Sequence, residues 1–267
     1  MTVYRILFKN IYMTTISTRL SWLFCSLLNC GIFNASASDY QWLSDAEFIH
    51  AVTLENQDAQ QFLAVSESMG IALIDEQGSV LSDIPTKSEH LDFRWLPNST
   101  QQGVLTTLDI NTGNVQLIKV DFADNKLELA IKYKPKNTAI DALCLGASSQ
   151  NIELFTVDVA GEVNQLILDT SENEAWQLTE INRFPVGLNM KSCAVNDVTD
   201  ALYITEENIG VWRYSTNPEH EIIRTLLQLP AGLEVEYVDT TAIGDVAVVS
   251  PSINSVWLLE HSSNTLK

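Results

Sequence analysis

The stretch LYITEENIGVWRY, from Leu202 to Tyr214, has two apolar strands joined by a short acidic turn. Gly210 closes the turn, and glycine accepts the positive φ that a tight hairpin requires. Further segments of the chain have the same organisation, and they start at Phe62, Val104, Glu153 and Val246. The hairpin is therefore the repeating unit from which we infer the fold.

The turns of these hairpins recur at a regular interval. The residues that close them are Gly70, Gly113, Gly161, Gly210 and Asn254, which are 43, 48, 49 and 44 residues apart. Repeats of about 40 to 50 residues made only of short strands are typical of β-propeller blades, whereas a β-sandwich lacks recurrence of the whole unit. We predict an all-β fold, a β-propeller of four-stranded antiparallel blades.

The number of units indicates an incomplete ring. Residues 38–267 hold about five blade units, whereas blades of this length usually close in rings of about six or seven. An open arc leaves the edges and faces of its end blades uncovered. We therefore predict an incomplete propeller that is completed by another domain or by a second chain.

The first 37 residues have the pattern of an export signal. Arg19 precedes the apolar run Leu20–Phe33, and Ala35–Ala37 forms a small-x-small cleavage site. The run has 14 residues, which is too short to span a bilayer comfortably. We predict a signal peptide at 1–37, with translation starting at Met13, and a secreted or periplasmic domain at 38–267 that has no membrane contact after signal removal.

The four cysteines fall into two groups. Cys25 and Cys30 lie in the predicted signal, and the sequence Leu-Leu-Asn before Cys30 also allows a lipoprotein. Cys144 and Cys193 belong to the mature domain, each in an apolar run that indicates a strand. In an exported protein these two form either one disulfide or two buried thiols.

Composition excludes several kinds of partner. The chain carries 15 Lys and Arg against 34 Asp and Glu, a formal net charge of −19, and 46% of its residues are hydrophobic. The apolar content is sufficient for a core, and the negative charge repels nucleic acid and anionic membranes. We expect no nucleic acid partner.

One long segment connects the chain to a known family. KSCAVNDVTDALYITEENIGVWRY, from Lys191 to Tyr214, is similar to the pattern EGCVADDETGxLYIxEEDxGIWxY of the β-propeller phytases. The segments HLDFRW from His90, IDALCLG from Ile140 and EVEYVDTTA from Glu234 resemble further motifs of that family, in the same order. The resemblance implies an exported six-bladed propeller that uses calcium to release phosphate from myo-inositol hexakisphosphate.

The resemblance also supplies candidate site residues. Glu206 falls on a calcium-binding carboxylate of the pattern and is followed by Glu207, while Glu234 and Glu236 fall on its D-x-E. Glu206, Glu234 and Glu236 are therefore the candidate calcium ligands, and carboxylate oxygens are what calcium prefers. Lys191 stands where the pattern has Glu, and we predict that its ammonium replaces a calcium ion among the channel carboxylates.

The cationic residues with which the family binds phosphate are absent from this chain. The family's Asn-Arg falls near Asp109-Ile110, its Lys-Glu becomes Val159-Ala160, and its first-hairpin Lys falls in the segment 66–69. Asp141 replaces a tyrosine of the pattern. Without these cations the phosphate would lack its electrostatic partners. We therefore predict no catalytic residues.

Three functional hypotheses follow. The chain resembles the degenerate N-terminal propeller of dual-domain phytases, which implies a non-catalytic accessory domain that contacts a catalytic phytase domain or a second chain and helps to handle inositol phosphates. The first alternative is a weak calcium-dependent phosphatase that uses Glu206, Glu234, Glu236 and Asp141. The second alternative is a secreted propeller that serves protein interaction alone.

Overall fold

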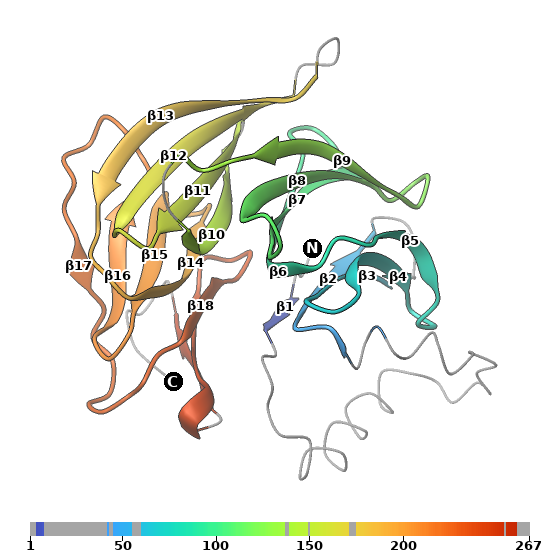
Figure 1. Cartoon of the computed structure of the whole chain (residues 1–267). Helices are drawn as coiled ribbons and strands as arrows, with labels where there is room; N and C mark the ends of the chain where they lie inside the picture. The colour runs from blue at the N-terminus through green and yellow to red at the C-terminus, as the bar shows by residue number, and fades with distance from the viewer. Residues whose placement is uncertain are drawn as a thin grey trace.

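The computed structural model describes residues 4–7, 42, 45–54, 60–136, 139–148, 150–170, 175–253 and 255–260. These residues form five antiparallel sheets, and within each sheet the strands follow one another in chain order. The sheets are arranged around a common centre as the blades of a β-propeller (Figure 1). The predicted all-β propeller of about five blade units is confirmed.

The first three sheets contain the larger number of strand residues. The first sheet consists of β1 (Tyr4–Leu7), β2 (Phe48–Thr53), β3 (Gln60–Ser66), β4 (Gly70–Asp75) and β5 (Val80–Ile84). The second consists of β6 (Ser88–Trp95), β7 (Gln102–Asp109), β8 (Asn114–Asp121) and β9 (Lys126–Tyr133). The third consists of β10 (Ile140–Ala147), β11 (Ile152–Asp158), β12 (Glu162–Asp169) and β13 (Gln177–Pro185).

The last two sheets are smaller. The fourth consists of β14 (Met190–Asn196), β15 (Ala201–Glu206), β16 (Gly210–Ser215) and β17 (Thr225–Leu226). In the fifth, β18 (Tyr237–Thr240), β19 (Val246–Ser250) and β20 (Ser255–Leu259) are joined in chain order, with the 3-10 helix η1 (Pro251–Ile253) between the last two. The fifth sheet therefore has three strands among the described residues.

The hairpin glycines adopt the backbone conformation that the sequence predicts. Gly70, Gly113, Gly161 and Gly210 have φ values of 111°, 67°, 79° and 137°. Each closes the turn before the third strand of its blade, with β2 counted as the first strand of the first blade, and a side chain there would be strained. The fifth predicted turn residue, Asn254, lies outside the described residues.

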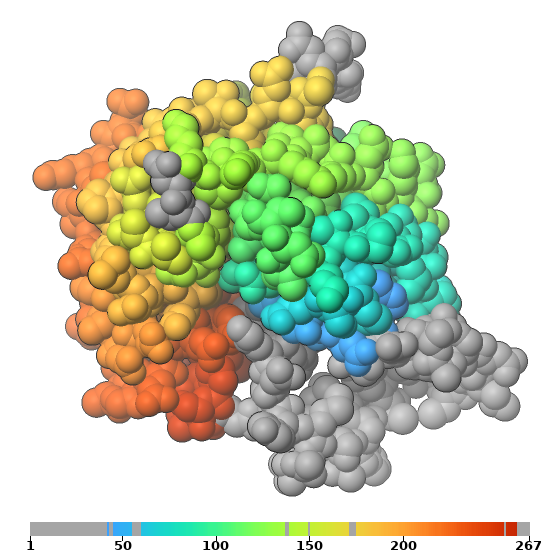
Figure 2. All heavy atoms as spheres, in the orientation of Figure 1, coloured from blue at the N-terminus to red at the C-terminus, as the bar shows by residue number. Residues whose placement is uncertain are grey.

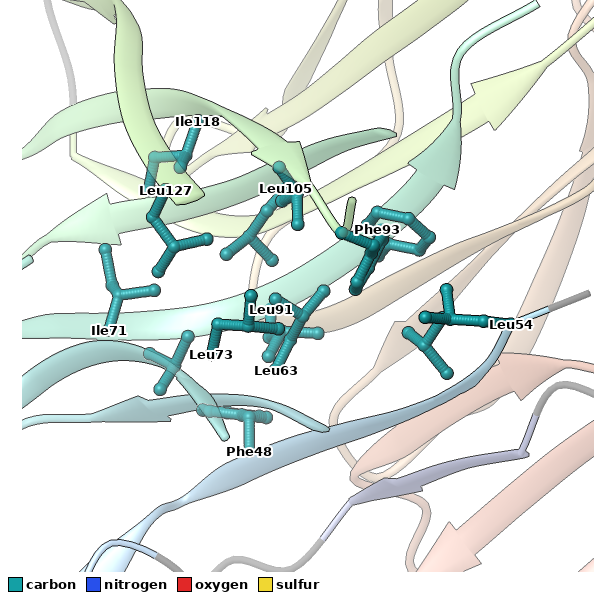
Figure 3. Packing of buried hydrophobic residues seen from close by; sticks show 14 residues of the cluster. Phe48, Leu54, Leu63, Ile71, Leu73, Leu91, Phe93, Leu105, Ile118 and Leu127 are labelled. Carbon is teal, nitrogen blue, oxygen red and sulfur yellow. The ribbon is translucent and has the colours of Figure 1, made fainter. Parts of the chain in front are cut away.

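The core lies between the blades rather than at the centre of the molecule. The first and second sheets enclose a cluster that includes Leu63, Ile71, Leu105 and Ile118 (Figure 3). Three similar clusters join the second sheet to the third, the third to the fourth and the fourth to the fifth. Because each middle sheet is covered on both faces, its inner strands are apolar on both sides, whereas the outer strand β9 alternates exposed and covered residues.

The blades follow one another in chain order around an arc. The inner strands of the second to fifth sheets pack against each other as β6, β10, β14 and β18, and β6 also packs on β2. Figure 2 shows the atoms of the second, third and fourth sheets adjoining in that order. Between the fifth and first sheets, the described residues show no comparable strand packing. The other face of the first sheet instead carries a small buried cluster of Ala64, Ala72 and Ile74 with Trp42 packed against it.

The N-terminal prediction is described only in part. Tyr4–Leu7 pairs with β2, with Tyr4 opposite Ala51, so this segment extends the first sheet at its inner edge. The apolar run Leu20–Phe33, the cleavage site and the boundary at residue 37 lie outside the described residues. None of the helices in the described part is long and apolar enough to cross a membrane.

The two remaining cysteines form a disulfide. Cys144 of β10 and Cys193 of β14 are bonded, with their Cα atoms 5.8 Å apart, and both are buried between the third and fourth sheets. The structure therefore selects the disulfide over the two free thiols. The bond connects the inner strands of neighbouring blades. Its two cysteines are 49 residues apart in the chain.

Candidate functional site

The turns between the second and third strands of the five blades lie at one end of the propeller, because all blades share one strand order. We call this end the upper face, and its turns are 66–70, 109–114, 158–162, 206–210 and 250–255. Backbone hydrogen bonds tie several of these turns to the segment that precedes the inner strand of the same blade. Ile110 N donates to Lys87 O at 3.1 Å, and Glu207 N donates to Asn189 O at 3.0 Å.

Lys191, the predicted replacement cation, lies on the upper face beside carboxylates. Its Nζ is 3.2 Å from Oε2 of Glu207, and both side chains are partly exposed. Asp141 of β10 is also within electrostatic reach: burial raises the pKa of its carboxyl, Lys191 lowers it, and Asp158 raises it. The ion-pair partner of Lys191 is thus the second glutamate of the opening hairpin.

Glu206 contacts an aromatic side chain on the next strand of its own blade. Its Oε2 accepts a hydrogen bond of 2.5 Å from Nε1 of Trp212 on β16. The guanidinium of Arg224 lies over the same indole, 4.3 Å from its centroid. Burial raises the pKa of the nearby Tyr214, Arg224 lowers it, and Glu206 raises it. Glu206 therefore serves as the acceptor that fixes Trp212.

The two other predicted calcium ligands lie just before β18. Glu234 is exposed, and Glu236 is partly covered. The hydroxyl of Tyr237 donates to Oε1 of Glu236 at 3.0 Å. Burial raises the pKa of Tyr237, and Glu236 and Glu67 raise it further, so the acidic upper ends of the first and fifth sheets are electrostatically close.

The structure does not gather the three candidates around one point. Within the described part of the chain, no group of three or more His, Cys, Asp or Glu side chains could share a metal ion. Glu206, Glu234 and Glu236 each have separate surroundings. Calcium binding by these residues stays a prediction.

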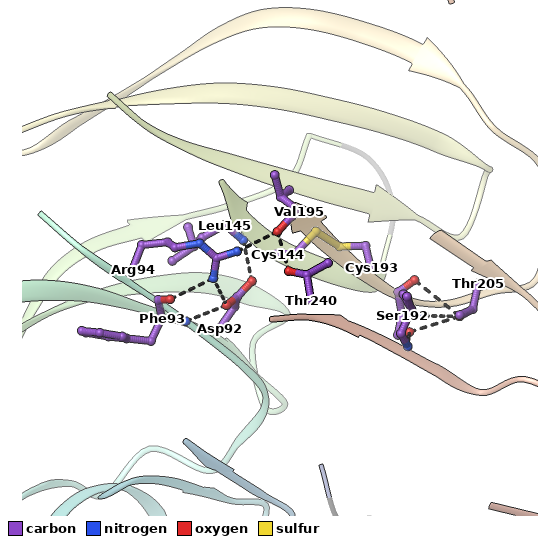
Figure 4. The surroundings of a disulfide bond; sticks show 11 residues. Asp92, Phe93, Arg94, Cys144, Leu145, Ser192, Cys193, Val195, Thr205 and Thr240 are labelled. Carbon is purple, nitrogen blue, oxygen red and sulfur yellow. Dashed lines mark hydrogen bonds and ion pairs between the residues drawn. A yellow bond between two sulfur atoms is a disulfide. The ribbon is translucent and has the colours of Figure 1, made fainter. Parts of the chain in front are cut away.

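A polar network at the opposite ends of the inner strands was not predicted from the sequence. Arg94 donates from Nη1 to Asp92 at 2.7 Å and from Nη2 to the Val195 carbonyl at 3.0 Å (Figure 4). Thr240 donates to the same carbonyl. The Nε of Arg94 donates to Asp197 at 2.7 Å. Burial lowers the pKa of the Arg94 guanidinium, but the carboxylates of Asp92 and Asp197 outweigh it and the pKa is raised. The signal in the sequence was an arginine in the apolar strand LDFRW.

This network joins blades and fixes their inner strands. Asp92 of the second sheet also accepts from the backbone N of Leu145 in the third, and Asp197 accepts from the backbone N of Ala147. The pKa of Asp197 is raised by burial, and Arg94 opposes the shift. Asp92 is buried, and the side chains of Arg94 and Asp197 are 17% and 33% exposed. Charges that are paired in this way hold the inner strands in place rather than offer open coordination to a ligand.

A cavity of about 300 Å³ opens at the upper face between the second and third sheets. Its rim carries the cations Lys136 and Arg183 and the acids Asp158 and Glu162. Arg183 is already ion-paired with Glu162 at 3.2 Å, and burial raises the pKa of the adjoining Tyr133. Because the charges on the rim balance, this cavity does not favour a polyanion.

Comparison with known proteins supports the fold. No family model and no curated protein sequence matches the chain. The structure is similar to the β-propeller domain of Cps50 (Swd1) from Myceliophteria thermophila, with a TM-score of 0.52 and 15% identity. The match covers 74% of this chain and 65% of that one, so the chain spans about two thirds of that propeller. At this identity the likeness shows the β-propeller fold alone.

Proposed function

We propose that this chain is an exported, phytase-like β-propeller without a catalytic site of its own, and that it acts as an accessory binding domain to a catalytic propeller. The segment from Lys191 to Tyr214 carries the family resemblance. The disulfide between Cys144 and Cys193 supports export, because such bonds persist in oxidising compartments. The arc that is open in the described residues supports completion by another domain or a second chain.

The ion pair of Lys191 carries the non-catalytic part of the proposal. Phosphate ester hydrolysis of this kind requires metal cations on the phosphate and a metal-activated water. At the position where the phytase pattern has Glu, an ammonium lies 3.2 Å from Glu207 and opposes the burial that raises the pKa of Asp141. Lysine thus neutralises the carboxylates that would otherwise attract calcium.

The test is phosphate release from inositol hexakisphosphate by the purified full chain, with calcium and with a chelator. We expect no release above background in either condition, in a sample whose cooperative urea unfolding shows that it is folded. Calcium-dependent release would overturn the proposal and favour the weak phosphatase. Binding of the same compound without turnover would agree with an accessory role in handling inositol phosphates.

Two substitutions separate the role of the lysine charge from that of its bulk. Lys191→Glu restores the carboxylate of the pattern beside Glu207 and Asp141, and Lys191→Gln is the matched neutral control. By calorimetry we expect calcium to bind Lys191→Glu more tightly than Lys191→Gln, with no detectable binding to the unsubstituted chain. Equal calcium binding by all three chains would show that Lys191 does not stand in for the ion.

A further inference from the structure

The turns of the upper face carry exposed aliphatic side chains in blade after blade. Ile110, Val159, Ile209 and Ile253 are 39%, 44%, 54% and 56% exposed, and each lies in the turn between the second and third strands of its blade. The corresponding turn of the first blade carries Met69, which is partly exposed. We call Ile110, Val159, Ile209 and Ile253 the aliphatic rim.

The positions of these side chains are unusual for tight turns. Turn residues are mostly Gly, Asn, Asp, Ser and Pro, for reasons of backbone conformation that do not call for an isoleucine or valine. The blades are already packed by four large apolar clusters. Leu188 is 59% exposed and lies close to the turn of Ile209. The next residue, Asn189, accepts a hydrogen bond from the backbone N of Glu207 in that turn. Single exposed apolar side chains are common on protein surfaces, but these recur at one structural position in successive blades, which indicates a surface used for binding.

The charge of the same turns defines the partner. The five turns contain Glu67, Asp109, Asp158, Glu162, Glu206 and Glu207. The turns themselves contain neither Lys nor Arg, and the chain has a net charge of −19. Asp109 and Asp158 are buried, Arg183 pairs with Glu162 and Lys191 pairs with Glu207, so the exposed charge comes from the remaining acids. An anionic surface with apolar points attracts a cationic partner and repels both a second copy of itself and an anionic membrane.

We infer that the aliphatic rim is a docking surface for a basic, amphipathic segment of a partner protein, in which Lys or Arg alternate with large apolar residues. The apolar residues of that segment contact the aliphatic rim, and its cations face the exposed acids Glu67 and Glu234. The inference rests on the proposed accessory role and names the chemistry of the partner. It does not depend on whether the upper face hydrolyses phosphate.

The experiment uses the full chain and a fluorescent peptide about 18 residues long, in which Leu and Lys are spaced so that a helix would carry them on opposite faces. The control peptide has the same number of Lys residues and has Ser in place of each Leu. The test variant is Ile110→Ser with Val159→Ser and Ile209→Ser. The control variant is Ile243→Ser, since Ile243 is 72% exposed but lies in the β18–β19 turn at the opposite end. Affinity is measured by fluorescence anisotropy at about physiological salt.

We expect the Leu–Lys peptide to bind the unsubstituted chain and the Ile243→Ser variant within about twofold of each other, and the triple variant at least about tenfold more weakly. Equal affinity of the triple variant, or equal affinity of the Ser-containing peptide, would overturn the inference, because charge alone would then explain binding. The inference would also be overturned if the unsubstituted chain formed a dimer that the triple variant does not form. The same holds if the unsubstituted chain bound phosphatidylcholine vesicles and the triple variant did not.

The two proposals fail separately. Phosphate release with rim-dependent peptide binding would refute the accessory role and leave the docking surface in place. Absence of both phosphate release and rim-dependent binding would retain the non-catalytic role and refute the docking surface.

Discussion

Reduction of the disulfide between Cys144 and Cys193 should destabilise the protein by about 4 kcal/mol. The bond closes a loop of 49 residues, and both cysteines are buried between the third and fourth sheets. In the chain-entropy account, the closed loop removes about 14 cal/mol/K of entropy from the unfolded state, which is about 4 kcal/mol at 25 °C. This is a large part of the stability of an ordinary domain.

The assay is urea unfolding followed by tryptophan fluorescence, with and without dithiothreitol. Reduction breaks the bond and removes no side chain, so it creates no cavity. The loss in the free energy of unfolding therefore measures the contribution of the cross-link alone. The double variant Cys144→Ala with Cys193→Ala is the control, and its unfolding should not respond to the reductant. A fully reduced chain with an unchanged free energy of unfolding would refute the reasoning, because the unfolded state would then be insensitive to the bond.

Three further changes test other parts of the structure by urea unfolding. Gly161→Ala should lower the free energy of unfolding by at least about 2 kcal/mol more than Gly113→Ala. Both glycines have positive φ, but of the two only Gly161 has a backbone atom, the Gly187 carbonyl O, where an added Cβ would lie. Equal losses would contradict this contact. Arg94→Met should cost about 3–5 kcal/mol, because the buried carboxylate of Asp92 loses its cation. A loss below about 1 kcal/mol would count against the network. Burial raises the pKa of Glu153 above 4.5, so its protonated carboxyl favours the folded state below that pH, and this stability is lost as the pH rises through the raised value. Glu153→Gln should therefore make the free energy of unfolding less dependent on pH over that range. An unaltered pH profile would argue against the shift.

Local patterns in the sequence were sufficient for the fold. The hairpin glycines recur at a nearly constant interval, and positive φ is a property of a residue and its immediate neighbours. Strand alternation and turn chemistry are likewise local. The five blades could therefore be predicted without knowledge of their contacts.

The candidate site could be predicted only in part. The resemblance placed Lys191 among acids, and the structure places Glu207 and Asp141 near it. Glu206, one of the channel carboxylates expected near Lys191, instead accepts a hydrogen bond from Trp212. Which of two adjacent glutamates meets a lysine depends on side-chain direction across the turn, and spacing in the sequence does not specify it.

By itself the sequence determined the repeating blade, the acidic surface and the absence of the phosphate-binding cations. Only the tertiary structure decided which residues of different blades meet. The disulfide requires two Cα atoms within a few ångströms, and Arg94 meets Asp197 from a strand 103 residues away in the chain. These contacts depend on how neighbouring sheets align face to face, which is set by the packing of whole apolar clusters and not by any short stretch of sequence.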